Sequence, residues 1–220
     1  EVNPHIVTVL IQGRPHVIDT VLTYSEAVLA SFYPGSRGGD GVADVLFGDY
    51  NPSGHLSVSL PRHVGQLPCY YNHKHNGAQK DYVDMCKEAL LPFGYGLSYS
   101  RFSYQNIKVP EVVYINDLYK YGMDIELKVY NDSDFDGEDV VQVYIKDHQA
   151  SIVSRVLELK GFEKVKVKAH ESQMVCIHLS AEAFSIWNYE MEFVVEAGDV
   201  SLCIGEDSER YQEFKVKLVK

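Results

Sequence analysis

The segment YNHKH, residues 71–75, holds the side chains whose types and spacing come closest to chemistry. His73 and His75 lie two residues apart, so both imidazoles would face the same side of an extended chain. Neutral imidazole is a common metal ligand and carries protons near neutral pH. No further ligand stands at a supporting distance in the sequence, so no metal site is predicted. A solvated loop is the simplest interpretation, and a polar loop that lines a cleft is the functional alternative.

A second candidate is the acidic segment DSDFDG, residues 132–137. Its three aspartates at alternate positions before Gly137 resemble the start of a calcium-binding loop. Such a loop needs a glutamate at its twelfth position, where this sequence has Val143. We therefore predict a polar hairpin loop between two strands.

The glycine-rich segment PGSRGGDG, residues 34–41, leads into a predicted helix, and anions bind at the amino end of a helix. The segment matches neither the dinucleotide-binding fingerprint nor the phosphate-binding loop. We interpret its glycines as a tight turn with close helix packing. No serine lies in the G-x-S-x-G pattern that presents a nucleophile. The residues by themselves therefore assign no catalytic group and no cofactor.

The overall composition argues against several classes of protein. The chain has 31 acidic and 20 basic residues and a formal net charge of −11, which argues against binding nucleic acid or an anionic membrane surface. No apolar run approaches the roughly 20 residues of a membrane helix. The four cysteines fit no zinc pattern, and we expect free thiols and a cytoplasmic location. The sequence does not begin with Met, so this expectation leaves a preceding signal peptide open.

The first hundred residues have the pattern of an α/β domain. The run 6–11 is apolar and rich in β-branched residues, as in a buried parallel strand, and 27–33 is a second candidate strand. Ser36 is expected to cap a helix that ends at Gly48. The alternating segment 55–61 predicts a half-buried strand. Two parallel strands do not make a doubly wound sheet, so we expect an incomplete parallel sheet.

The second half has the pattern of an all-β domain. About seven short segments alternate apolar and polar residues and are separated by turn residues. This pattern is typical of an immunoglobulin-like β-sandwich, and the lack of a Cys…Trp…Cys spacing favours the fibronectin type III variety. We therefore predict an α/β portion over 1–103, whose residues 62–103 form a connecting segment, and a fibronectin type III-like domain over 104–220.

The stretch LPFGYGLSYS, residues 91–100, lies where the first pattern gives way to the second. Its glycines permit a sharp turn, and its aromatic side chains carry large apolar areas that favour burial. We predict that the stretch fills a seam between the two domains. The side chains expected in the seam are Phe93, Tyr95, Leu97 and Tyr99.

Taken in order, these segments resemble the C-terminal part of glycoside hydrolase family 3, the β-glucosidases and β-xylosidases. SFYPGSRGGDGVADVLFGDYNPSGHLSVSLP is similar to the end of that family's α/β sandwich domain, and LPCYYNHK and LLPFGYGLSYSRFSY are similar to its connecting segment. GEDVVQVYIKD and EFVVEAGDVSLCIG are similar to its fibronectin type III-like domain. The resemblance spans about residues 5 to 205. The sequence departs from the family pattern at Phe32, Ser57 and Ala169-His170, which affects the expected strand ends.

The resemblance implies a retaining glycosidase that acts on an oligosaccharide or glycoside without a cofactor. One carboxylate attacks the anomeric carbon and a second carboxyl group protonates the leaving oxygen. In the family the nucleophile lies in an N-terminal barrel domain, and the acid/base group lies upstream of the segment matched here. Neither motif occurs in this sequence, so no residue receives a catalytic role and the isolated chain is expected to be inert. Tyr71, His73 and Lys74 are the candidates for an outer substrate subsite or a contact with the absent barrel.

Two alternatives stand beside this hypothesis of an enzyme part. One is a stand-alone carbohydrate-binding or interaction module, with a row of tyrosines near the start of the sandwich, and the other is one chain of a split enzyme. The incomplete sheet would also leave a strand edge and an apolar face open, so we expect the isolated chain to self-associate. The tyrosines of the row are Tyr114, Tyr119 and Tyr121.

Overall fold

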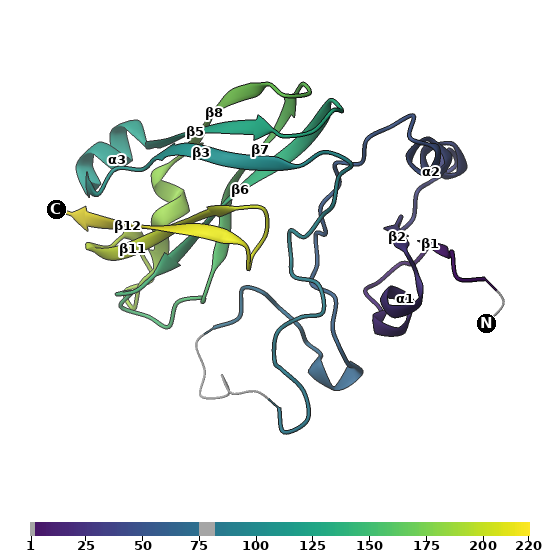
Figure 1. The fold of residues 1–220 in the computed structure, drawn as a ribbon. Coiled ribbons are helices and arrows are strands. Elements are labelled where there is room, and N and C mark those ends of the chain that lie inside the picture. The colour runs from purple at the N-terminus through teal and green to yellow at the C-terminus, as the bar shows by residue number, and fades with distance from the viewer. Residues whose placement is uncertain (1–2, 75–81) are drawn as a thin grey trace.

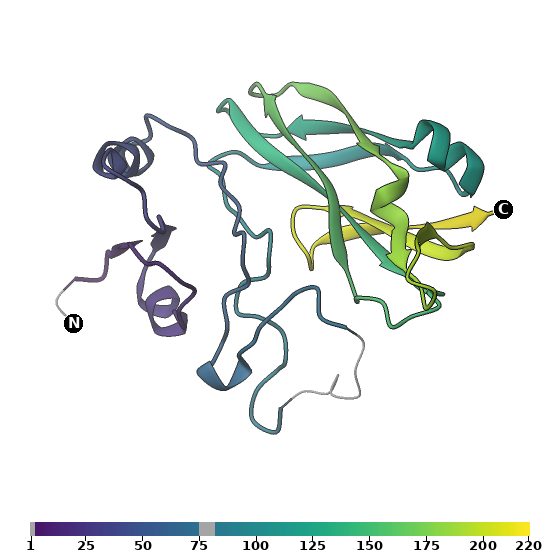
Figure 2. The same ribbon diagram turned by 180° about the vertical axis from the view of Figure 1, so that it is seen from behind.

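The computed structural model describes residues 3–74 and 82–220. A small α/β part and a β-sandwich lie at opposite ends of the molecule, and a long irregular segment runs between them (Figures 1 and 2). No helix among the described residues is long and apolar enough to cross a membrane.

The α/β part is one β-α-β unit followed by a helix. Strand β1 (Val7–Leu10) pairs in parallel with β2 (Ala27–Ala30), and the short helix α1 (Asp19–Tyr24) connects them. The two predicted strands are therefore confirmed, with shorter ends. The sequence patterns did not predict α1, which has six residues and no side-chain cap.

Helix α2 (Gly38–Phe47) ends as predicted but begins differently. Gly48 closes the helix with φ of 84°, in the left-handed region that glycine tolerates. The predicted cap by Ser36 is wrong, because Arg37 occupies the capping position and no side chain accepts a hydrogen bond there. The amide of Gly38 donates to the carbonyl of Gly35 at 3.1 Å. Residues 35–37 therefore belong to a turn after Pro34, and the helix begins only at Gly38.

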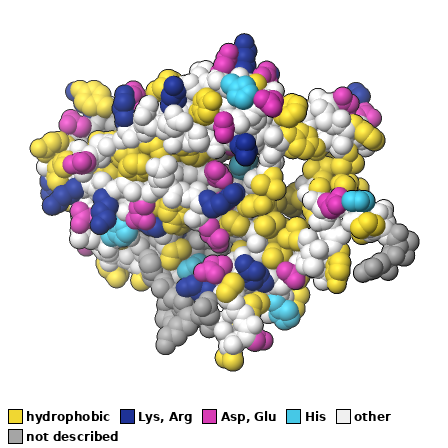
Figure 3. Space-filling model, viewed as in Figure 1, with side chains coloured by type: hydrophobic (Ala, Val, Ile, Leu, Met, Phe, Trp, Pro, Cys, Tyr) yellow, Lys and Arg dark blue, Asp and Glu magenta, His cyan; other side chains and the backbone are white. Residues whose placement is uncertain are grey.

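The α/β part leaves most of its apolar side chains uncovered. Among the described residues up to 50, Ile18 is the only large hydrophobic side chain that is buried. A parallel sheet is ordinarily covered on both faces, and this one has two strands. Figure 3 shows hydrophobic side chains exposed over this part and its junction with the irregular segment. The exposed set comprises Ile6, Val7, Ile11, Val17, Tyr24, Tyr33, Leu46, Phe47 and Tyr50.

The strand predicted at residues 55–61 is wrong. This segment is irregular and follows the returning segment 90–95 through separate backbone hydrogen bonds. The amide of Leu56 donates to the carbonyl of Tyr95 at 2.8 Å, and that of Leu60 donates to Leu91 at 2.9 Å. Leu60 is buried as expected, but the glycines and proline of the returning segment prevent a regular ladder.

The second half is a β-sandwich of two sheets, as predicted, and the strand pairs are antiparallel except for one parallel pair at an edge. Alternate residues of facing strands, such as Leu127, Val143 and Leu202, are fully buried between the sheets. One sheet has the order β3-β5-β8 and the other β4-β12-β11-β6-β7. The strands are β3 (Phe102–Lys108), β4 (Val112–Tyr114), β5 (Met123–Asn131), β6 (Gly137–Asp147), β7 (Glu158–Val167), β8 (Ser172–Leu179), β11 (Gly198–Gly205) and β12 (Tyr211–Val219).

A short helix and a small hairpin lie at the end of the sandwich that is farther from the α/β part (Figure 1). Helix α3 (Ile115–Tyr121) lies there, and the predicted row of tyrosines falls at its start and on it. A hairpin of β9 (Ser185–Trp187) and β10 (Phe193–Val195) follows a 3-10 turn, Ala181–Phe184. A second 3-10 turn, Val64–Gln66, lies in the irregular segment.

The acidic segment 132–136 is not a hairpin loop, because β5 and β6 belong to different sheets and the segment crosses between them. Its carboxylates do not converge. Asp134 faces the His170 imidazole at 2.8 Å, and Asp136 accepts the amide of Ala169 at 2.9 Å. Within the described residues no three His, Cys, Asp or Glu side chains form a metal-binding group.

Candidate functional site

The stretch LPFGYGLSYS packs against strand β6, and Gly94 lies at the closest approach. Its φ is 84°, and its carbonyl accepts a hydrogen bond of 3.1 Å from the Gln142 side-chain amide. The same amide donates to the carbonyl of Glu206, so Gln142 joins the stretch to the loop before β12. The Tyr144 hydroxyl donates to the Gln142 side-chain carbonyl at 2.5 Å. Both polar atoms of the buried Gln142 side chain therefore have hydrogen-bond partners in the seam.

An aromatic cluster extends the seam. Phe93 stacks on Tyr71 with ring centroids 4.2 Å apart, and both rings make T-shaped contacts with the ring of Tyr144. The prediction that Phe93 fills the seam is confirmed. Leu97, by contrast, is 70% exposed, so its predicted place in the seam is wrong.

The two remaining aromatic residues of the stretch make more peripheral contacts. Tyr95 is partly buried and lies beneath the Arg210 guanidinium, 5.0 Å from its ring centroid. Tyr99 is half exposed, and its hydroxyl donates to the carbonyl of Val45 in α2 at 2.6 Å. Tyr99 therefore anchors α2 to the seam, whereas Phe93 fills it.

Asn51 joins the same stretch to the crossing between the sheets. Its side-chain carbonyl accepts the Ser98 hydroxyl at 2.8 Å and the Tyr99 amide at 2.9 Å. Its side-chain amide donates to the Ser100 hydroxyl and to the carbonyl of Asp136. The turn NPSG after α2 thus supplies a side chain that connects three segments far apart in the sequence.

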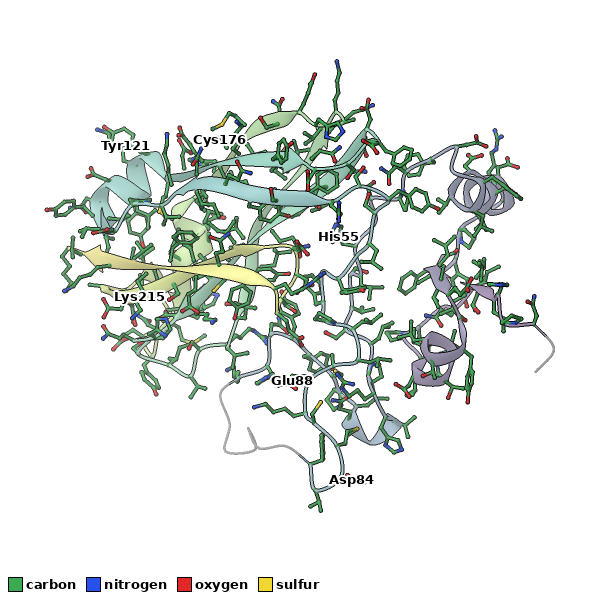
Figure 4. All side chains as sticks on the ribbon, viewed as in Figure 1. His55, Asp84, Glu88, Tyr121, Cys176 and Lys215 are labelled. Atoms are coloured by element: carbon green, nitrogen blue, oxygen red, sulfur yellow. The ribbon has the colours of Figure 1, made fainter. Side chains whose placement is uncertain are left out.

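Three polar side chains, His55, Asp139 and Tyr104, form a largely buried cluster beside this junction, where Figure 4 labels His55. The His55 Nδ1 atom lies 2.5 Å from the Gly94 carbonyl oxygen, and its Nε2 atom lies 3.8 Å from Asp139. The Tyr104 hydroxyl donates to the other oxygen of Asp139 at 2.7 Å. Burial and the Asp139 carboxylate raise the pKa of Tyr104 far above its usual value, so the phenol stays neutral and donates.

A cleft of about 660 Å³ opens between the irregular segment and the sandwich. Tyrosine rings and charged groups line it together, which suits a ligand with many hydroxyl groups better than a purely apolar one. The charged side chains include Glu88 from the irregular segment, labelled in Figure 4, and Lys146 and Glu209 from the sandwich. The wall also includes Tyr70, Tyr71, His73, Tyr82, Lys87, Asp147 and His148.

Burial and neighbouring charges shift the pKa values of several groups in and near the cleft. Burial, with Asp207 and Glu88 nearby, raises the pKa of the Glu209 carboxyl above its usual range. Lys146 binds the Glu213 carboxylate at 2.8 Å, and this hydrogen bond lowers the pKa of Glu213. Burial raises the pKa of the Cys203 thiol to about 12, so this thiol is not a nucleophile at neutral pH.

Two of the three predicted site residues, Tyr71 and His73, line the cleft. Tyr71 lies in its wall, but its hydroxyl accepts the Leu159 amide at 3.2 Å and its ring is stacked, so it holds the loop in place. His73 lines the cleft and is exposed. Lys74 is exposed and forms a backbone bridge with Arg155, outside the lining.

The predicted pairing of His73 with His75 is not tested, because His75 lies outside the described residues. His63, another histidine of the irregular segment, accepts the Gly65 amide at 3.1 Å and caps the 3-10 turn. The sandwich residues Lys146, His148 and Glu209 were not predicted as lining residues. No sequence signal connects them with His73, because they are more than 70 positions away along the chain.

Comparisons with known proteins agree with this architecture. The family model of the glycosyl hydrolase family 3 C-terminal domain matches residues 1–99, and that of the fibronectin type III-like domain matches residues 139–208. The periplasmic β-glucosidase of Salmonella typhimurium is 36% identical over 97% of this chain, and a putative β-xylosidase of Formosa agariphila is 34% identical over 98%. The crystal structure of a β-glucosidase from Listeria innocua with glucose superposes with a TM-score of 0.91, at 37% identity over 97% of this chain.

An α/β unit joined through a seam of polar and aromatic contacts to a fibronectin type III-like sandwich is the C-terminal architecture of a class of glycosidases. The chain belongs to glycoside hydrolase family 3 and corresponds to the C-terminal part of its members. It spans 29% of the length of the Salmonella protein and 31% of the Listeria chain.

Proposed function

We propose that this chain is the C-terminal portion of a retaining β-glycosidase of the β-glucosidase or β-xylosidase type, which hydrolyses terminal non-reducing β-linked sugars. The observation that carries the proposal is the continuous similarity to β-glucosidases over 97% of the chain, in sequence and in structure. The two carboxyl groups of the retaining mechanism belong to the rest of the enzyme. This chain contributes a rigid support for that part.

The proposed role is structural because the seam is held by many specific contacts. Gln142, Asn51 and the Phe93–Tyr71 stack connect the α/β part, the irregular segment and the sandwich. The exposed apolar side chains of the α/β part would then pack against the remainder of the α/β domain and the barrel. In the absence of those partners, exposed apolar patches of this kind promote association.

The purified 220-residue chain tests both statements. It is expected to release no product from aryl β-glucosides or aryl β-xylosides above the uncatalysed rate. It is also expected to scatter light as a dimer or larger species at high concentration, because the uncovered apolar face remains. Turnover that is abolished by one carboxylate substitution in this chain would contradict the structural role. A monomer at the highest soluble concentration would contradict self-association.

We also propose an outer-subsite or interface role for His73 and Lys74, with Tyr71 positioning their loop. In the full-length enzyme, His73→Ala is expected to raise KM for oligosaccharides about two- to tenfold, the equivalent of one hydrogen bond, and to leave aryl monoglycosides unchanged. The matched control is His63→Ala, because that side chain caps a turn outside the cleft. Unchanged KM and unchanged thermal stability in His73→Ala would remove this residue from both roles.

A further inference from the structure

The β9–β10 hairpin displays an unusual set of exposed side chains at the end of the sandwich. Trp187 and Phe193 are a cross-strand pair, with ring centroids 5.3 Å apart and planes tilted by 35°. Their exposed fractions are 57% and 44%, and Tyr189 and Met191 at the turn are 79% and 75% exposed. Large apolar side chains gathered in this way on a soluble domain mark an interaction surface. We call these four residues the aromatic platform.

The platform is held in shape by its own turn. The Asn188 amide donates to the Glu192 carbonyl at 3.0 Å, and the Asn188 side-chain carbonyl accepts the Glu192 amide at 2.9 Å. Met191 has φ of 60°, which the turn imposes on a residue that rarely adopts it. Because the backbone is already ordered, the hairpin itself loses little conformational entropy when a ligand stacks on its rings.

Helix α3 lies beside the free edge of the hairpin. The Tyr119 hydroxyl accepts the Val195 amide at 2.9 Å, so the predicted row of tyrosines adjoins β10. Tyr121, labelled in Figure 4 at the outer end of the sandwich, is 62% exposed. The structure therefore joins Tyr119 to β10, the strand that pairs with β9, which carries Trp187, the only tryptophan of the chain.

The negative charge of the hairpin and its flanking residues indicates which classes of ligand can bind there. Residues 181–199 contain five carboxylates, those of Glu182, Glu190, Glu192, Glu196 and Asp199, and no Lys or Arg. This excess disfavours anionic lipid or nucleic acid, and two copies of the hairpin would repel one another. A neutral sugar chain meets no such repulsion. Its C–H faces can cover aromatic rings, and its hydroxyl groups can donate to Glu190 and Glu192, the two carboxylates of the hairpin turn.

We propose that the aromatic platform binds a neutral β-linked polysaccharide, outside the cleft described above. The choice of a polysaccharide rests on the proposed glycosidase function. The platform would keep the enzyme on a polymeric substrate, while cleavage takes place elsewhere in the molecule.

Native affinity electrophoresis of the 220-residue chain tests the proposal, in gels that contain barley mixed-linkage β-glucan or wheat arabinoxylan. The chain is expected to be retarded by at least one of the two polysaccharides. Trp187→Ala is expected to weaken that binding about two- to tenfold, the loss of one aromatic stacking contact, and Trp187→Phe is expected to retain most of it. The matched control is Phe47→Ala, which removes an exposed aromatic side chain of α2.

Retardation that Trp187→Ala reduces and Phe47→Ala leaves unchanged would support the platform. Absence of retardation in both gels, or equal retardation of wild type and Trp187→Ala, would overturn it. Circular dichroism of each variant verifies the fold, and since Trp187 is more than half exposed, its removal is expected to leave the spectrum unchanged. The proposed glycosidase function is tested separately by hydrolysis with the full-length enzyme, so either proposal can fail alone.

Discussion

Replacing Gly94 by alanine is expected to lower the free energy of unfolding by about 3 kcal/mol or more. Gly94 has φ of 84°, a left-handed conformation that disfavours any side chain. A Cβ atom there would lie 2.8 Å from the Tyr144 hydroxyl oxygen and closer still to the Gln142 side-chain carbonyl oxygen. Both neighbours are buried and hydrogen-bonded to each other, so neither can move without losing a partner.

Gly48→Ala is the matched control for this prediction. Gly48 has the same φ of 84°, but a Cβ atom there meets nothing within 4 Å. Its substitution therefore reports the backbone strain alone, about 1–2 kcal/mol. Urea unfolding followed by circular dichroism measures both variants. Equal midpoints for the two would show that the clash with Gln142 contributes nothing, and would contradict the close packing of the seam.

Leu127→Ala is the second large effect, with an expected loss of about 3–5 kcal/mol in the free energy of unfolding. Leu127 lies in the middle of β5 and is completely buried between the two sheets. Truncation removes apolar contacts and leaves a cavity that the surrounding β-structure cannot close. Loss of the sandwich core would also release the hairpin and β6, on which the platform and the seam depend.

The control for the core substitution is Leu97→Ala, which makes the same chemical change at an exposed position of the seam stretch. Its expected effect is within about 0.5 kcal/mol, as for most surface substitutions. Thermal unfolding monitored by Trp187 fluorescence, the signal of the only tryptophan in the chain, follows the sandwich in both variants. A destabilisation by Leu97→Ala as large as that by Leu127→Ala would restore Leu97 to the seam.

Residue pattern was sufficient to predict the two kinds of fold in the chain. A period-2 alternation along β5 can bury Ile125, Leu127 and Val129 on one face only, so the sandwich followed from sequence. The apolar run of β1 and the closing Gly48 were recognisable for equally local reasons. The family was recognisable from long ordered motifs, whose order a chance match would not reproduce.

Patterns failed where a partner segment decides the local structure. Leu56, Val58 and Leu60 alternate like a strand, but the segment opposite them contains Gly94 and Pro92 and offers only separate hydrogen bonds. The loop after β5 was predicted as a hairpin because a turn within one sheet and a crossing between two sheets have the same local composition. The 1–103 and 104–220 domain division stays a prediction, and β3 of the sandwich begins at Phe102.

The sequence by itself therefore determined the family, the α/β and sandwich classes, and the position of the seam, since each depends on residues that are close together along the chain. Only the tertiary structure decided what the chemistry-bearing residues do. It placed Tyr71 in a supporting stack, lined one cleft with both Glu209 and His73, and joined Tyr119 of α3 to β10 of the hairpin that carries Trp187. Such neighbours are separated by tens of residues, and their proximity arises from the packing of whole sheets, which no local pattern encodes.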